Sequence, residues 1–142
     1  MYAPAQQPKR DLIDTEALAS VFEKYPQILA VYLFGSTAVG GIHAESDLDL
    51  ALVPGDSGLK EVYFRILTDV VAAGWDDVSL VILDEDIDIV LKSEAVQPNR
   101  VIYQRPEFDR GAYYSSVLRE YFDFLPYILV QEQAYKERVL GG

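Results

Sequence analysis

Two aspartates, Asp47 and Asp49, stand one residue apart and follow a Gly-Ser pair at Gly35 and Ser36. Side chains on a β-strand alternate between faces, so both carboxylates would share one face, roughly 6–7 Å apart at the backbone. One divalent cation can bridge oxygens at that separation, and Mg²⁺ prefers oxygen ligands. A glycine turn before a helix start offers N–H groups to phosphate, and Ser36 adds a hydroxyl donor. Each motif alone is common on exposed strands and turns, but together they predict a metal–nucleotide site.

The surrounding sequence must supply the strands that hold these groups. Residues 28–34 are apolar throughout, which predicts a strand buried on both faces. Residues 47–53 predict a second strand, whose leucines face the core while the aspartates share the other side. Further strands are predicted over 78–83 and 101–103. Helices are predicted over 15–25, from a cap at Asp56 or Ser57 to Gly74, and over 86–96. Residues 108–139 predict one or two helices, which Pro126 interrupts or kinks. This order predicts an α+β fold: a mixed sheet of about four strands with helices packed on it.

The length, cysteine count and net charge limit the classes of protein that are possible. The chain has 142 residues, which predicts a single domain over residues 11–142 with a C-terminal helical tail, after a loose N-terminal arm at 1–10. The absence of cysteine excludes disulfides and thiolate zinc sites. A net charge of −11 disfavours general nucleic-acid binding. No stretch predicts a signal peptide or a membrane span, so a cytoplasmic protein is expected.

Gly35-Ser36, ten intervening residues and then Asp47-Leu48-Asp49 resemble the signature of the DNA polymerase β-like nucleotidyltransferase superfamily. The runs VYLFGS and SDLDLALV look like those of its minimal nucleotidyltransferases, and residues 78–103 are similar to the strand–helix–strand that follows there. The resemblance covers most of the chain beyond the first ten residues, and its N-terminal motif is the most specific part. It implies the polymerase β-like palm fold.

Within that group the sequence resembles the antitoxins of HEPN–nucleotidyltransferase toxin–antitoxin pairs. The resemblance implies transfer of AMP from ATP to a tyrosine hydroxyl of a HEPN-type ribonuclease toxin, which would be its partner in a hetero-oligomer; a homo-oligomer is also open. It further implies that Gly35 and Ser36 hold the triphosphate, while Asp47 and Asp49 bind Mg²⁺ and carry the catalysis.

The sequence departs from the family at the third carboxylate. Ser79 occupies its expected slot on the next strand, and serine has no charge and is no base there. Asp77 lies two residues earlier, on the same face if the strand is regular, and a bulge would let it reach the metal and act as the third catalytic carboxylate. A solvated aspartate at a strand start is the alternative. Thr37 and Val39 stand where relatives often carry arginines, which implies weaker nucleotide binding.

Three functions remain open from the sequence. The first is the adenylyltransferase antitoxin, the second is a catalytically impaired antitoxin that neutralises the toxin by binding only, and the third is a small-molecule nucleotidyltransferase. The third class usually has a larger substrate domain than this chain offers. His43 is expected to be an exposed loop residue, and Arg100, Arg105 and Arg110 to be solvated charges. Tyr113, Val117 and Tyr121 are expected in the core, with Phe122, Phe124 and Tyr127 facing a partner.

Overall fold

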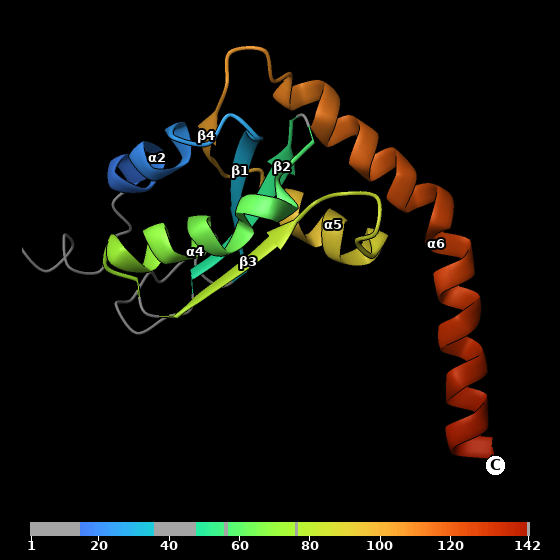
Figure 1. The fold of residues 1–142 in the computed structure, drawn as a ribbon. Helices are drawn as coiled ribbons and strands as arrows, with labels where there is room; N and C mark the ends of the chain where they lie inside the picture. The colour runs from blue at the N-terminus through green and yellow to red at the C-terminus, as the bar shows by residue number, and fades with distance from the viewer. Residues whose placement is uncertain (1–14, 36–47, 56, 76, 142) are drawn as a thin grey trace, which may run out of the picture.

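The computed structural model describes residues 15–35, 48–55, 57–75 and 77–141. Four strands and the helices between them follow the order that the sequence predicted, and the fold is α+β (Figure 1). The predicted arm at residues 1–10 lies outside the described residues. The elements are α2 (Thr15–Glu23), β1 (Ile28–Phe34), β2 (Leu48–Pro54), η2 (Lys60–Val62), α4 (Tyr63–Ala72), β3 (Val78–Ile82), α5 (Ile89–Val96), β4 (Val101–Gln104) and α6 (Arg110–Gly141).

The strands form one mixed sheet in the order β3-β2-β1-β4. β1 pairs antiparallel with both β2 and β4, whereas β2 and β3 run parallel. The two apolar strands β1 and β2 are therefore central, which is where strands covered on both faces belong. Because β1 and β2 are antiparallel, the end of β1 and the start of β2 meet at one edge of the sheet.

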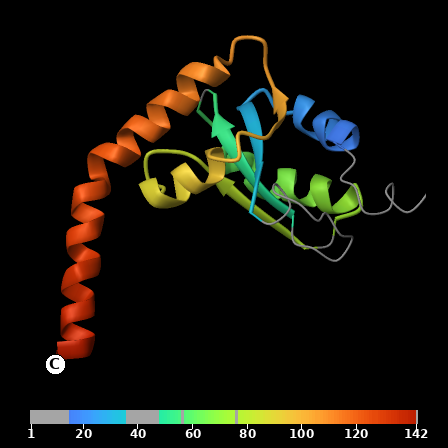
Figure 2. The same cartoon turned by 180° about the vertical axis from the view of Figure 1, so that it is seen from behind.

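Helices pack on both faces of the sheet (Figures 1 and 2), and a hydrophobic cluster lies on each face. Alternation sends Leu48, Leu50 and Leu52 of β2 to the face covered by α2 and α4, where all three are fully buried. Ala51 and Val53 face the other side and pack with residues of α5 and of the first turns of α6. Asp49 lies on this second face, as the predicted alternation requires.

The helix predicted to start at a cap on Asp56 or Ser57 begins later in the structure. The turn η2 starts at Lys60, and α4 follows it. Gly58 has a φ of +102°, a left-handed conformation that a right-handed helix cannot include, so helical structure starts only beyond it. Gly74, with φ +116°, follows the end of α4 as the predicted C-terminal cap position requires.

The helix predicted over 86–96 also begins later, at Ile89. Asp88 is its cap, because the Asp88 Oδ1 atom accepts a 2.7 Å hydrogen bond from the backbone N–H of Val90. This fixes α5 directly after β3 and over the second face of the sheet, close to β1 and α6.

The last helix, α6, is a single element of 32 residues with Pro126 inside it. Figure 1 shows that it bends part-way along, and a proline accounts for a bend because it removes a backbone hydrogen bond and crowds the preceding turn. Val117 is its one fully buried residue among those described. The expectation that Tyr121 lies in the core was wrong, because the helix leaves the body before that point. No helix in the described ranges is long and apolar enough to cross a bilayer.

Candidate active site

The edge where β1 ends and β2 begins holds Gly35 and Asp49. Phe34, the last residue of β1, is the antiparallel partner of Asp49. Gly35 follows with a φ of +72°, and a Cβ atom placed on it would lie only 2.2 Å from Oδ2 of Asp49 and 3.0 Å from its Cγ. The space that a side chain would need is therefore occupied by the Asp49 carboxylate. Only glycine combines this backbone conformation with so close an approach.

The backbone of Asp49 is held from both sides. β1 pairs with it through Phe34, and β3 pairs with it through Ser79. Its neighbours Leu48 and Leu50 are fully buried on the opposite face, while Asp49 itself is half-buried. A residue whose backbone lies in a central strand between two buried leucines cannot drift, so the carboxylate is presented at a fixed place on the sheet edge.

Ser79 occupies the position on β3 directly beside Asp49. Residues opposite each other in adjacent strands project to the same face, so the Ser79 side chain lies on the carboxylate side of the sheet. Ser79 is exposed. The structure therefore has a hydroxyl at the cross-strand position where the family resemblance predicts a third acid.

Asp77 lies immediately before β3 and is exposed. Its backbone carbonyl accepts a 2.9 Å hydrogen bond from the N–H of Leu48, which ties it to the start of β2. The register pairs Leu48 with Val78, and Asp77 directly precedes that pair. Asp77 therefore lies at the same sheet edge as Asp49.

Several predicted site residues lie outside the described residues. These are Ser36, Thr37, Val39, His43 and Asp47. The predicted pairing of Asp47 with Asp49 and the phosphate contact of Ser36 thus stay predictions.

Magnesium fits the chemistry of this edge. Carboxylate oxygens are the ligands it prefers, and Asp49 presents one carboxylate beside the strand start that carries Asp77. Among the residues that the structure describes, no three acidic or histidine side chains gather closely enough to bind a metal. The predicted ligand set contains Asp47, which is outside them, so the metal site also stays a prediction.

A groove of about 520 Å³ adjoins the glycine. It is lined by Phe34, Gly35, Glu94, Gln97 and Pro98, so one wall is the end of β1 and the other is the end of α5 with its following turn. Sequence reasoning missed Glu94 and Gln97. Their sequence positions carry no signal for this role, because only the packing of α5 on the sheet brings them beside Gly35.

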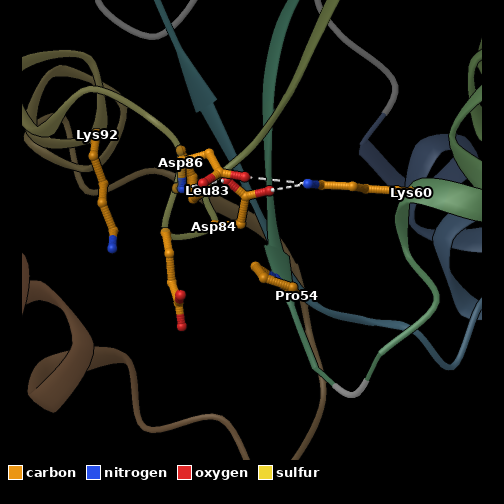
Figure 3. Close-up of a pocket in the computed structure, with 7 residues that line it drawn as sticks. Pro54, Lys60, Leu83, Asp84, Asp86 and Lys92 are labelled. Carbon is orange, nitrogen blue, oxygen red and sulfur yellow. Dashed lines mark hydrogen bonds and ion pairs between the residues drawn. The ribbon is translucent and has the colours of Figure 1, made fainter.

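The opposite end of β2 carries a second hollow, of about 410 Å³, between Pro54, Lys60, Leu83 and the acids of the turn after β3 (Figure 3). Lys60 Nζ lies 3.5 Å from Asp84 Oδ2 and 3.3 Å from Asp86 Oδ2. The hydrogen bond to Asp86 and the charge of Asp84 raise the pKa of Lys60. These exposed charges satisfy one another, which is typical of a surface ion cluster rather than of a catalytic site.

Two of the three arginines around β4 have structural partners. Arg105 Nε forms a 2.9 Å ion pair with Glu107, and Arg110 donates to the Asn99 side chain at 3.1 Å and also to the Asn99 carbonyl. Asn99 has a φ of +56°, so Arg110 holds a left-handed turn in place. The side chain of Arg100 is exposed, while its carbonyl accepts a 2.8 Å bond from Leu33.

Comparison with known proteins bears on this geometry. The sequence profile of the family described as "Polymerase beta, Nucleotidyltransferase" matches residues 16–108, which contain the whole sheet and the Gly35–Asp49 edge. No curated protein matches the sequence significantly.

Solved structures share the fold at low sequence identity. A mutant of the toxin-antitoxin MntA-HpeT matches with a TM-score of 0.69 and 19% identity, over 90% of this chain and 99% of that chain. A toxin-antitoxin with AMP-PNP matches with a TM-score of 0.67 and 21% identity, over 90% and 99%. A tri-AMPylated Shewanella oneidensis HEPN toxin in complex with MNT antitoxin matches with a TM-score of 0.61 and 19% identity, over 89% and 95%.

Proposed function

The chain belongs to the polymerase beta nucleotidyltransferase family, and we propose that it is an antitoxin that transfers AMP from ATP to a tyrosine hydroxyl of a HEPN ribonuclease toxin. Similar folds have been solved in toxin–antitoxin complexes, one with AMP-PNP and one with an AMPylated HEPN toxin. These supply the nucleotide, the acceptor class and the partner of the proposal. The observation within this chain that carries it is the Asp49 carboxylate packed against the Gly35 backbone in the family's signature.

The chemistry assigns a task to each group. The tyrosine oxygen attacks the α-phosphorus of ATP, the bond from that phosphorus to the α–β bridging oxygen breaks, and pyrophosphate leaves. In the proposal the backbone of Gly35 and the hydroxyl of Ser36 hold the triphosphate, and Asp77 receives the tyrosine proton. Mg²⁺, when held by Asp47 and Asp49, supplies neutralisation of the phosphate charge.

The position of Ser79 favours a second candidate function. It stands directly across from Asp49, where the family resemblance predicts a carboxylate, and a hydroxyl neither neutralises a cation nor accepts a proton readily. The alternative is an antitoxin of the same fold that binds and neutralises the toxin without modifying it. Ser79→Asp separates the two candidate functions. If the missing carboxylate limits the reaction, restoring it should raise the rate of AMP transfer.

The experiment follows the mass of the partner. The purified chain is incubated with ATP, MgCl₂ and the product of the neighbouring gene as the candidate toxin, and mass spectrometry counts the AMP units added. Mutating a residue that hydrogen-bonds to a metal ligand typically lowers activity roughly 10–100-fold. Asp49→Asn changes a proposed ligand itself, so it should lower the rate of AMP transfer by more than that. Asp84→Asn, the same change in the cluster at the far end of the sheet, is the matched control and should leave transfer unchanged.

Each outcome decides between the candidates. A toxin that stays unmodified but binds tightly supports the binding-only antitoxin, and one that neither binds nor gains AMP refutes the toxin as partner. Label that appears on an added small-molecule alcohol in place of the toxin would favour a small-molecule nucleotidyltransferase.

A further inference from the structure

The distal half of α6 projects from the body as an arm without a partner. Both views show it running clear of the sheet and of the other helices (Figures 1 and 2). Of the ten large apolar residues exposed in the described part of the chain, all but Phe64 and Val71 lie on α6 from residue 122 onward. Apolar residues exposed along one helix mark that helix as an interaction element, and the spacing of its residues decides which of its faces docks a partner.

One face of the arm carries apolar residues at heptad spacing. Half-buried positions recur at Tyr121, Leu125 and Ile128, and the same alternation of four and three residues continues to exposed positions beyond them. We name this set the arm stripe: Tyr121, Leu125, Ile128, Glu132, Tyr135 and Val139. A seam that repeats every 3.5 residues is what one helix presents to another helix packed along it.

The base of the arm is fixed to the body. The ring of Tyr113 lies 6.1 Å from that of Tyr32 on β1 and 5.4 Å from that of Phe108. Arg110 adds its two hydrogen bonds to Asn99, and Val117 is buried. The arm stripe is therefore held in a set direction relative to the sheet, as a docking surface must be if it is to position a bound protein.

The arm runs down one side of the body. In Figure 1, α6 starts at the top of the sheet and its distal half descends beyond α5, on the side away from the start of β2. A protein packed along the arm would therefore lie on the α5 side of the body.

The arm stripe contains one charge, Glu132. It lines a hollow of about 500 Å³ together with Ile128, Gln131, Tyr135 and Lys136. A polar residue at a seam position fixes register at a cost in stability and needs a partner of matching chemistry. The surface that packs here must therefore place a basic or hydrogen-bond-donating side chain opposite Glu132, within an otherwise apolar helix face.

We infer that the arm stripe docks an apolar helix of the HEPN toxin, with a basic or donor side chain facing Glu132; this rests on the proposed function for the identity of the partner. The toxin–antitoxin structures support that choice of occupant. Their matches cover 90% of this chain, so they must include part of the 32-residue α6.

The test compares two faces of the same arm. Ile128→Gln with Tyr135→Gln changes the stripe. Tyr127→Gln with Val130→Gln is a closely matched pair of substitutions on the outer face, which is the side of the helix opposite the stripe and carries Tyr127, Val130 and Glu137. Glutamine keeps the helix propensity in both variants. Titration calorimetry measures the affinity of each full-length variant for the candidate toxin, the product of the neighbouring gene. The stripe variant should bind at least about tenfold more weakly, as loss of central interface anchors does. The outer-face variant should bind as wild type does.

A second pair tests the chemistry of the occupant. Glu132→Lys should weaken binding more than Glu137→Lys, because Glu137 lies on the outer face; equal effects would overturn the predicted basic or donor contact. Circular dichroism should show that all four variants keep the helix content of wild type.

The outcomes separate this inference from the proposed function. Wild-type affinity in the stripe variant, with AMP transfer intact, would overturn the arm inference alone. A wild-type chain that neither binds nor modifies the toxin would overturn the proposed function. A wild-type dimer that the stripe variant converts to a monomer in sedimentation, with toxin binding unchanged, would overturn the inference by showing that a second copy covers the stripe.

Discussion

Aspartates lie near both ends of β2, and the structure holds them differently. At the start of the strand, Asp49 is half-buried, packs on the backbone of Gly35 and has strand neighbours on both sides. Beyond the end of the strand, Asp84 and Asp86 lie on a turn and share the cation of Lys60. One carboxylate is positioned by the backbone of the fold, and the others are neutralised by a flexible side chain.

This difference supports the proposal that Asp49 is the acid that takes part in the chemistry. A catalytic group must be held in a fixed geometry by rigid elements, and a central strand is more rigid than an exposed turn. A surface ion cluster needs no such fixation, and its exposed pairs contribute little to stability. The proposed active site is therefore taken from the close approach of Gly35 to Asp49 and not from the hollow at the far end of β2.

Gly35→Ala should have the largest effect, because it breaks the contact that distinguishes the two ends. The new Cβ would have to displace the Asp49 carboxylate, and alanine at φ +72° adds a strain of about 1–3 kcal/mol. We expect AMP transfer to the toxin to fall at least about 100-fold, since misplacement by 1 Å alone can cost that much.

Gly74→Ala is the control for Gly35→Ala. It also forces alanine into a left-handed conformation, at φ +116°, but nothing lies within 4 Å of the new Cβ. It should lower the melting temperature while leaving transfer at the wild-type rate. Equal loss of transfer in both variants would mean that backbone strain, and not the position of Asp49, explains the effect.

Much of this edge was predictable from the sequence. The seven apolar residues of β1 set its bounds correctly, and alternation correctly sorted the leucines of β2 from Asp49. The pairing of Ser79 with Asp49 could be anticipated only through the family resemblance, because parallel register depends on a crossover that local sequence does not specify. Glu94 and Gln97 could not be found, since their place beside Gly35 depends on how α5 packs.

The helix starts and the arm show the limits of local signals. Capping residues at Asp56 and Ser57 predicted that a helix starts there. The helical structure begins only after Gly58, because the left-handed φ of Gly58 cannot be part of a right-handed helix. In α6, Pro126 left open whether there would be one helix or two, and the structure has one bent helix. The spacing of the aromatic residues did not reveal that Tyr121 lies beyond the body, because a seam facing a partner and a seam facing the core have the same period.

A smaller effect, on stability, is expected from changing Asp69, whose carboxylate is bound by the side chains of Tyr25 and Lys24. The Tyr25 hydroxyl donates to Asp69 Oδ2 at 2.5 Å and Lys24 lies 3.3 Å away; the Tyr25 hydrogen bond is the main cause that lowers the pKa of Asp69. A lowered folded pKa stabilises the protein above the ordinary pKa of an aspartate and loses that contribution as pH falls. Asp69→Asn should therefore lower the melting temperature at pH 7, and the difference from wild type should narrow below about pH 4.

Tyr25→Phe provides the complementary change. Burial, followed by the hydrogen bond to Asp69, raises the pKa of Tyr25 to about 12. A raised folded pKa gives stability that is present below the ordinary tyrosine pKa and is lost as pH rises through 12. The variant should be less stable than wild type at pH 7, with transfer unchanged. A deficit of Asp69→Asn that stays constant from pH 7 to pH 3 would contradict the assigned origin of the Asp69 shift.

The smallest effect is expected from Lys60→Met, which removes the cation of the far cluster and keeps most of its apolar stem. Exposed ion pairs contribute little net stability, so the melting temperature should change by less than about 2 °C. AMP transfer and toxin affinity should equal those of wild type, because the cluster is at the opposite end of β2 from Asp49. A large loss of AMP transfer in a folded Lys60→Met protein would contradict this comparison. It would mean that the exposed Lys60 cluster takes part in the reaction, which is proposed to take place at the Gly35–Asp49 edge.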